Sequence, residues 1–218
     1  MGGRSERVTA RDQWPAIARQ LQAELPGEWS IRGAQRFMVK EPVEWLLSWI
    51  AYGHTGSFGT LSAGVTPLIE AFTGWHMKYG LRMDSVPGGP RSIDLNDPDA
   101  PRIARDFALG PALQEINEWS LERLADIAER DLARPPRKRD RYSHLAPACR
   151  VIFDTGSPEE AAREIAEKCR EQGIPGGPEY YEGLIAAWQS GGRDEALQYL
   201  RQYRDKVLAD EGMDQIRS

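Results

Sequence analysis

The spacing of apolar residues changes twice along this chain, and the two changes constrain its fold more than any motif. Up to Pro26 the apolar residues recur at helical spacing, as Trp14 and Leu21 do. From Trp29 they alternate with polar residues, which is the period of a half-buried strand. From Pro101 the helical period returns. We therefore expect an α+β fold, with a sheet-forming N-terminal half and a mostly helical C-terminal half.

The alternating part predicts an antiparallel sheet of about four strands after an N-terminal helix. Residues 29–40 indicate one strand, or a pair of strands broken near Gly33. Residues 43–52 are almost continuously apolar and indicate a buried strand. Residues 58–65 and 75–83 are the next expected strands. Because the connections are short, the strands should form a meander, with the helix covering one face.

A connector rich in proline, glycine and aspartate separates the two parts. We place the N-terminal helix and the sheet in residues 1–95, and the helical region in residues 96–218, as two domains or one composite domain. Within the helical region the pattern after Pro101 predicts a short helix followed by a long one. A loop is then expected over residues 134–148, and the C-terminal helices over 158–210. Residues 149–153 fit either a strand or a helix.

The clearest local signal is the segment Ser157-Pro158-Glu159-Glu160. Serine is a good N-cap, proline suits the first helical position, and Glu160 completes a capping box. The helix that starts there should end at Gly173. Two further helices, joined by the short link at residues 189–196, should form an antiparallel hairpin.

Composition and charge narrow the classes of function. The chain is 40% hydrophobic and 28% charged, as in ordinary globular proteins. A formal net charge of -5 argues against a nucleic-acid partner, since binding to phosphates draws on lysine and arginine. No apolar run approaches transmembrane length, and the N-terminus lacks a secretory h-region, so we expect a cytoplasmic protein with no membrane partner. Cys149 and Cys169 lack the spacing of a zinc site, and we expect no metal and no cofactor.

Asp154-Thr155-Gly156-Ser157, which follows the apolar Val151-Ile152-Phe153, resembles the active-site segment of the aspartic proteases. Their chemistry needs two such aspartates that share a proton, and this chain has one copy, so a homodimer would have to supply the second. The alternative is a loop that delivers Ser157 as the cap of the next helix. We favour the loop, because a charged helix pattern follows where the protease would continue as a strand.

Histidine and glycine residues give further candidates. His54, His76 and His144 lie far apart in the sequence, and a lone histidine beside aromatic residues is more often structural than catalytic. The glycines of residues 53–59 favour a hairpin turn over a phosphate-binding loop, because a strand pattern follows them. A small enzyme with an acid or base at His54, His76 or Asp154 remains the alternative function.

Two groups of residues are candidate binding surfaces. A basic run around residues 134–141 could contact nucleic acid or an acidic partner, although a solvated loop is the usual interpretation. An aromatic group could line a ligand groove, although packing in the core is the default. The basic run comprises Arg134, Arg137, Lys138, Arg139 and Arg141, and the aromatic group comprises Trp45, Trp49, Tyr52, Trp75 and Tyr79.

The order of helix, alternating strand, apolar strand, glycine turn and the segment AGVTPLI, followed by WHMKYGLRM, resembles an uncharacterised group of small bacterial α+β domains. The resemblance spans residues 13–83. Some members of that group lie near toxin–immunity loci, which implies a protein that docks on another protein and performs no chemistry of its own. The leading hypothesis is therefore a non-enzymatic protein-binding protein of the immunity or regulatory kind, with another protein as partner.

Overall fold

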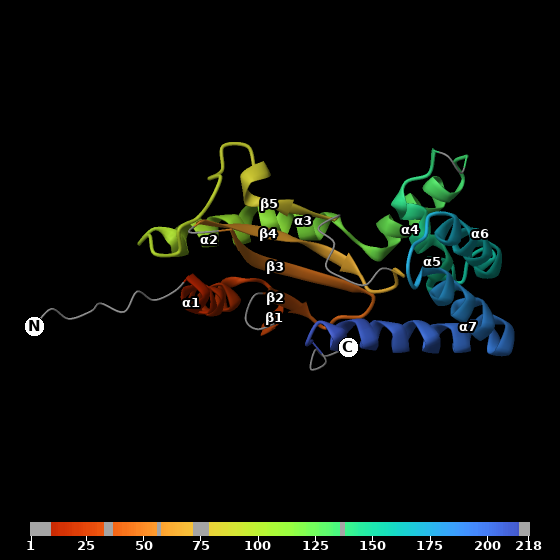
Figure 1. The fold of residues 1–218 in the computed structure, drawn as a ribbon. Helices are drawn as coiled ribbons and strands as arrows, with labels where there is room; N and C mark the ends of the chain where they lie inside the picture. The colour runs from red at the N-terminus through yellow and green to blue at the C-terminus, as the bar shows by residue number, and fades with distance from the viewer. Residues whose placement is uncertain (1–9, 33–36, 56–57, 72–78, 136–137, 214–218) are drawn as a thin grey trace, which may run out of the picture. The chain divides into compact units, whose positions relative to one another are not determined.

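The computed structural model describes residues 10–32, 37–55, 58–71, 79–135 and 138–213 (Figure 1). Within these ranges the chain forms two compact units. The sheet unit holds residues up to 66 together with 79–118, and the helical unit holds residues 67–71 and 119–213. The predicted α+β fold is confirmed, with an N-terminal helix, an antiparallel sheet and a mostly helical C-terminal half. The domain boundary near residue 95 stays a prediction.

In the described residues the sheet has five strands instead of about four, because residues 29–40 form a pair. Arg32 lies opposite Phe37 in that pair, on either side of the undescribed residues 33–36. The order in the sheet follows the order in the chain, as predicted for a meander. The third and fourth strands extend into residues 53–59, so only residues 56–57, which lie outside the described residues, are left for the predicted hairpin turn. The strands are β1 (Glu28–Arg32), β2 (Phe37–Glu41), β3 (Leu46–Thr55), β4 (Phe58–Pro67) and β5 (Tyr79–Arg82).

Helix α1 (Ala10–Glu24) packs on the sheet through aromatic stacking. The Trp14 ring stacks on the Tyr52 ring of β3, with the ring centroids 5.7 Å apart. Where the helix ends, the Trp29 indole donates a hydrogen bond of 3.1 Å to the Pro26 carbonyl, so the first strand is fixed against the end of the helix. The predicted helical stop at Pro26-Gly27 is therefore confirmed.

Instead of the expected short helix followed by a long one, residues 100–132 form three successive α-helices. Helix α2 (Ala100–Phe107) passes through a π-helical turn, η2 (Ala108–Ala112), into α3 (Leu113–Glu118), and α4 (Leu121–Leu132) then starts as a new helix. Pro111 lies in the π-helical turn and has no N–H to donate. The Ser120 hydroxyl accepts a hydrogen bond of 3.1 Å from the Arg123 N–H, so Ser120 is the N-cap of α4.

Residues 149–153, which fit either a strand or a helix by sequence, are helical. The expected loop at 134–148 is shorter than predicted, since a 3-10 helix, η4, begins at Arg141. The predicted capping at Ser157 is confirmed, because its hydroxyl accepts a hydrogen bond of 3.3 Å from the Glu160 N–H. The elements after α4 are η4 (Arg141–Leu145), α5 (Ala146–Phe153), α6 (Pro158–Glu171) and α7 (Gly177–Asp210).

Helix α7 reverses direction at Gly191-Gly192, so its two arms form the predicted antiparallel hairpin (Figure 1). Gly192 has φ 65° and ψ −143°, a conformation that is essentially restricted to glycine. The arms are joined by a hydrogen bond of 2.9 Å from the Tyr199 hydroxyl to the Tyr180 carbonyl. The rings of Tyr180 and Tyr203 also contact, with centroids 4.5 Å apart.

Candidate functional site

A partly open cleft of about 490 Å³ lies in the helical unit, bordered by α4, by α5 and by the segment between α5 and α6. Its lining combines acidic and apolar side chains. Helix α4 contributes four residues and the α5 region contributes the others. The lining residues are Glu122, Ala125, Asp126, Glu129, Arg150, Phe153, Thr155 and Gly156.

Helix α4 brings three carboxylates to the cleft because of their spacing. Glu122, Asp126 and Glu129 are separated by four and then three residues, which places them on one face of a helix. The opposite face of α4 is buried and holds Leu124 and Ala128. The amphipathic pattern of α4 therefore turns the acidic stripe outward, toward the cleft.

Arg150 of α5 forms the wall opposite α4. Its Nε and Nη2 atoms donate to the two carboxylate oxygens of Glu129 at 2.7 and 2.8 Å, and its Nη1 atom donates to the Ser157 carbonyl at 2.8 Å. The hydrogen bonds to Glu129 raise the pKa of the Arg150 guanidinium, against the opposing effect of burial. One side chain thereby joins α4, α5 and the start of α6.

The segment from Asp154 to Ser157 forms the link between α5 and α6. Asp154 is exposed and adopts the left-handed conformation that ends α5, with φ 54° and ψ 52°. The following Thr155 N–H donates a hydrogen bond of 3.0 Å to the Arg150 carbonyl. The apolar residues before Asp154 form a helix, and not the strand that the protease resemblance implies. The preferred interpretation, a loop that delivers the Ser157 cap, is confirmed.

Arg193, at the bend of α7, fixes the C-terminal end of α5. Its guanidinium donates hydrogen bonds of 3.0 and 2.7 Å to the carbonyls of Val151 and Ile152. Carbonyls at a helix end have no partner within the helix, and a cation near them is favourable. The side of the cleft formed by α5 is therefore held by two arginines, Arg150 and Arg193.

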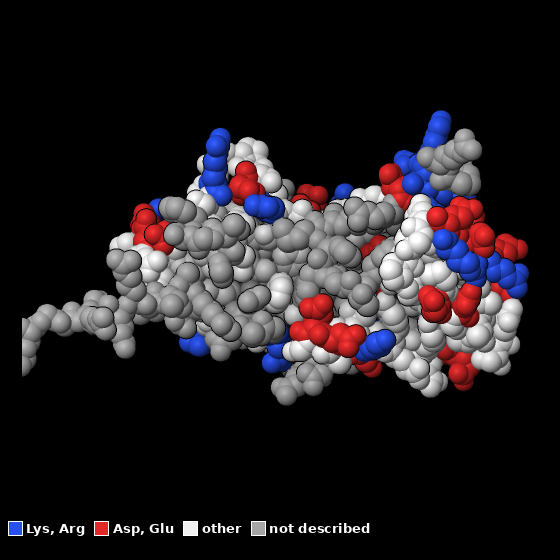
Figure 2. Space-filling view, viewed as in Figure 1, with Lys and Arg blue, Asp and Glu red and all other residues white. Residues whose placement is uncertain are grey.

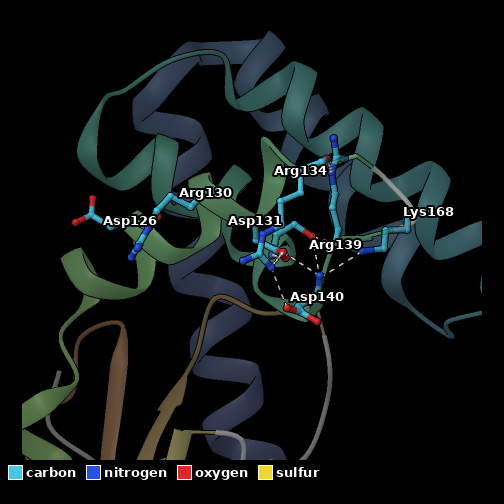
Figure 3. Close-up of polar contacts among 8 residues, drawn as sticks. Asp126, Arg130, Asp131, Arg134, Arg139, Asp140 and Lys168 are labelled. Atoms are coloured by element: carbon cyan, nitrogen blue, oxygen red, sulfur yellow. Dashed lines mark hydrogen bonds and ion pairs between the residues drawn. The ribbon is translucent and has the colours of Figure 1, made fainter.

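The cleft carries an excess of negative charge. Three carboxylates and one guanidinium line it, which leaves a formal charge of -2. Hydrogen bonds from its own backbone N–H and from the Ser120 hydroxyl lower the pKa of Glu122. Within the described ranges the Asp126 carboxylate enters no ion pair, and Arg130 donates to the Asp126 carbonyl instead. Figure 3 shows the Asp126 carboxylate pointing away from Arg134 and Arg139.

The basic run at residues 134–141 is largely neutralised where its side chains are described. The Arg139 side chain is only 9% exposed and pairs with Glu164, while Arg134 pairs with Asp140 at 3.1 Å. Both lie around Asp131, which is 2% exposed (Figure 3). The face shown in Figure 2 carries acidic and basic side chains interspersed over the helical unit. Arg137 and the side chain of Arg141 lie outside the described part of the chain, and Lys138 is exposed.

Asp131 organises this loop, and the sequence interpretation missed it. Its carboxylate accepts hydrogen bonds of 2.9 Å from the backbone N–H groups of both Asp140 and Ser143. The sequence does contain a signal of its burial, because Asp131 lies on the same face of α4 as the apolar residues Leu124 and Ala128. A carboxylate at such a position needs buried partners.

Three of the proposed aromatic binding residues are buried in the sheet unit. Trp45, Trp49 and Tyr79 are 6%, 2% and 1% exposed, and the Trp49 indole donates a hydrogen bond of 3.0 Å to the Thr66 hydroxyl. This burial agrees with the interpretation of core packing. Trp75 lies outside the described residues.

The candidate acids and bases are not brought together among the described residues. His76 and the side chain of His54 lie outside the description, and Asp154 is exposed at a helix end. His144 is buried, with its Nδ1 atom 3.9 Å from the Cys169 sulfur. Burial raises the pKa of the Cys169 thiol. The enzymatic alternative at His54, His76 or Asp154 stays a prediction.

No protein-family model, curated protein or solved structure matched this chain. The resemblance to a group of bacterial domains therefore stays a prediction. In the part of the chain that the structure describes, no helix combines the length and apolarity needed to span a membrane. Any inference about function has to start from the geometry of the cleft.

Proposed function

We propose that the chain is a non-enzymatic protein-binding protein, of the immunity or regulatory kind, and that its cleft between α4 and α5 docks on another protein. The observation that carries the proposal is the combination of exposed carboxylates with an apolar wall. Asp126 and Glu122 are exposed, whereas Phe153 and Ala125 are half-buried in the same cleft. Interfaces typically join an apolar centre to a polar rim in this manner.

The walls of the cleft are fixed before any partner binds. The Arg150 guanidinium ties α5 to α4, and Arg193 ties the end of α5 to α7. A binding surface that is already rigid loses less conformational entropy on association. The same contacts fix the helices around the cleft and leave the carboxylates of Glu122 and Asp126 exposed, which supports docking.

Electrostatics favours a partner with a basic surface. The cleft has a formal charge of -2, and the whole chain has a formal net charge of -5. Complementary charge accelerates association and selects among partners more than it adds affinity. Immunity and regulatory proteins that act by docking need only such a surface.

Site-specific photo-cross-linking in the native cell tests this proposal. The full chain would carry p-benzoyl-phenylalanine in place of Thr155, which is exposed and lines the cleft. A matched chain would carry it in place of Glu171, which is exposed at the end of α6 and does not line the cleft. We expect one protein to be cross-linked at Thr155 and absent at Glu171. A lack of any protein adduct specific to Thr155 would overturn the proposal.

A further inference from the structure

We infer that the cleft receives a basic side chain of the partner, with the cation at Asp126 and Glu122 and its stem against Phe153. This inference rests on the proposed function and specifies the chemistry of the partner. The inference has two grounds. Arg150 neutralises only one carboxylate of the cleft, and apolar side chains lie beside the other two.

The ion pair of Arg150 divides the three carboxylates of α4 into two kinds. Glu129 is engaged by two hydrogen bonds from Arg150, so its charge is offset inside the protein. Glu122 and Asp126 have no such cation among the described residues. They lie four residues apart on one helix face, close enough for one guanidinium to lie between their carboxylates.

The apolar part of the cleft suits the stem of such a side chain. Phe153 and Ala125 are half-buried in the lining, and each leaves an apolar surface beside the carboxylates. Long basic side chains bury their methylene groups on apolar surface and keep the charge at a polar rim. A cation near the Phe153 ring also gains cation–π attraction.

The volume of the cleft is large enough for a long basic side chain. A cleft of about 490 Å³ falls within the range of roughly 300–1,000 Å³ that is usual for ligand pockets. It has room for an arginine side chain together with the residues on either side of it in a partner segment. Arginine is favoured over lysine, because its planar fork can contact two carboxylates at once.

A matched set of three small probes tests the inference on the full chain by amide NMR titration. Benzamidinium is cationic, benzamide is neutral and benzoate is anionic, and all three carry the same ring. We expect benzamidinium to give saturable shifts at the amides of Ala125, Thr155 and Gly156 up to about 20 mM. Benzamide should bind at least about fivefold more weakly, and benzoate should not shift these amides.

Three variants locate the charge. Asp126→Asn and Glu122→Gln should each weaken benzamidinium binding about threefold to tenfold, and Glu171→Gln should leave it unchanged. All three positions are exposed, so folding is preserved, and this is checked by the unperturbed amides of α6 and α7. Equal binding of benzamide and benzamidinium, shifts outside the cleft, or no shift at all would each overturn the inference.

The two proposals fail separately. A protein adduct at Thr155 combined with equal binding of the cationic and neutral probes would overturn the basic-side-chain inference and leave the proposed function intact. Charge-selective binding of benzamidinium without any protein adduct would overturn the proposed function, whereas the preference of the cleft for a cation would stand.

Discussion

Arg150 and Glu129 form an ion pair with two points of contact, Nε to Oε1 at 2.7 Å and Nη2 to Oε2 at 2.8 Å. The same guanidinium donates to the Ser157 carbonyl at 2.8 Å. The pair lies in the wall of the cleft and spans 21 residues of sequence. The shape of the proposed docking surface therefore depends on a contact between two helices.

Replacement of Arg150 should destabilise the helical unit. Arg150→Ala removes three hydrogen bonds, and the partly exposed setting of Glu129 limits the cost to about 2 kcal/mol. Arg150→Lys should rescue only part of this loss, because an ammonium cannot reproduce the fork. Chemical denaturation of the full chain measures both effects.

Arg163 provides the matched control for that experiment. Its ion pair with Glu159 lies on the surface of α6, and its side chain is 62% exposed. Arg163→Ala should change the free energy of unfolding by less than about 0.5 kcal/mol. Equal stability of Arg150→Ala and Arg163→Ala would contradict the structural role of the Arg150 contact.

Loss of the Asp131 carboxylate should open the basic loop. Asp131→Ala leaves the N–H groups of Asp140 and Ser143 without their acceptor, which costs about 2–4 kcal/mol. Trypsin should then cleave between residues 134 and 141 faster than in the original chain, as followed by mass spectrometry. Asp154→Asn is the control, since Asp154 is exposed and asparagine tolerates its left-handed conformation. Cleavage at the same rate in both variants would be evidence against the role of Asp131.

The tyrosines of the α7 hairpin should make the fold sensitive to alkali. Burial raises the pKa of Tyr199 and of Tyr203 to about 12, from an ordinary value of 10.0. The folded state therefore favours the neutral phenol, and this contribution to stability is complete below pH 10 and lost as the pH rises toward 12. Ultraviolet titration should show phenolate appearing late in the folded protein and near pH 10 in denaturant. Coincident titration curves would rule out a packed tyrosine cluster.

Gly192 should be sensitive to a single added methyl group. Its φ of 65° and ψ of −143° would be strained in any other residue, so Gly192→Ala should cost about 1–3 kcal/mol. Gly110→Ala is the comparison, because a Cβ atom there would meet no atom within 4 Å. Denaturation midpoints of the two variants measure the difference. An undiminished midpoint in Gly192→Ala would mean that α7 does not bend as described.

Local patterns were sufficient for most of the fold, because they act within a few residues. The alternation after Trp29, the cap at Ser157 and the glycines of the α7 bend each predicted an element that the structure contains. Residues 149–153 were ambiguous, since an apolar run of that length suits a strand or a helix equally. Their helical end is held by Arg193, 41 residues from Ile152, and no local pattern reports such a contact.

The candidate site was largely missed for the same reason. The spacing of Glu122, Asp126 and Glu129 could have been recognised as an acidic stripe on one helix face. The sequence could not show that Arg150 neutralises Glu129, because this pairing depends on how α4 and α5 pack. The candidate residues drawn from conspicuous types, Trp45, Trp49 and Tyr79, are buried instead.

The most direct test of docking through the cleft is a pair of charge reversals. Each variant is tested for binding to the purified partner that the cross-link at Thr155 identifies. Asp126→Lys and Glu171→Lys make the same change of charge at exposed positions inside and outside the cleft. We expect the affinity, measured by calorimetry, to fall at least about tenfold for Asp126→Lys and to stay within about twofold for Glu171→Lys. Equal affinities for the two variants would contradict the account.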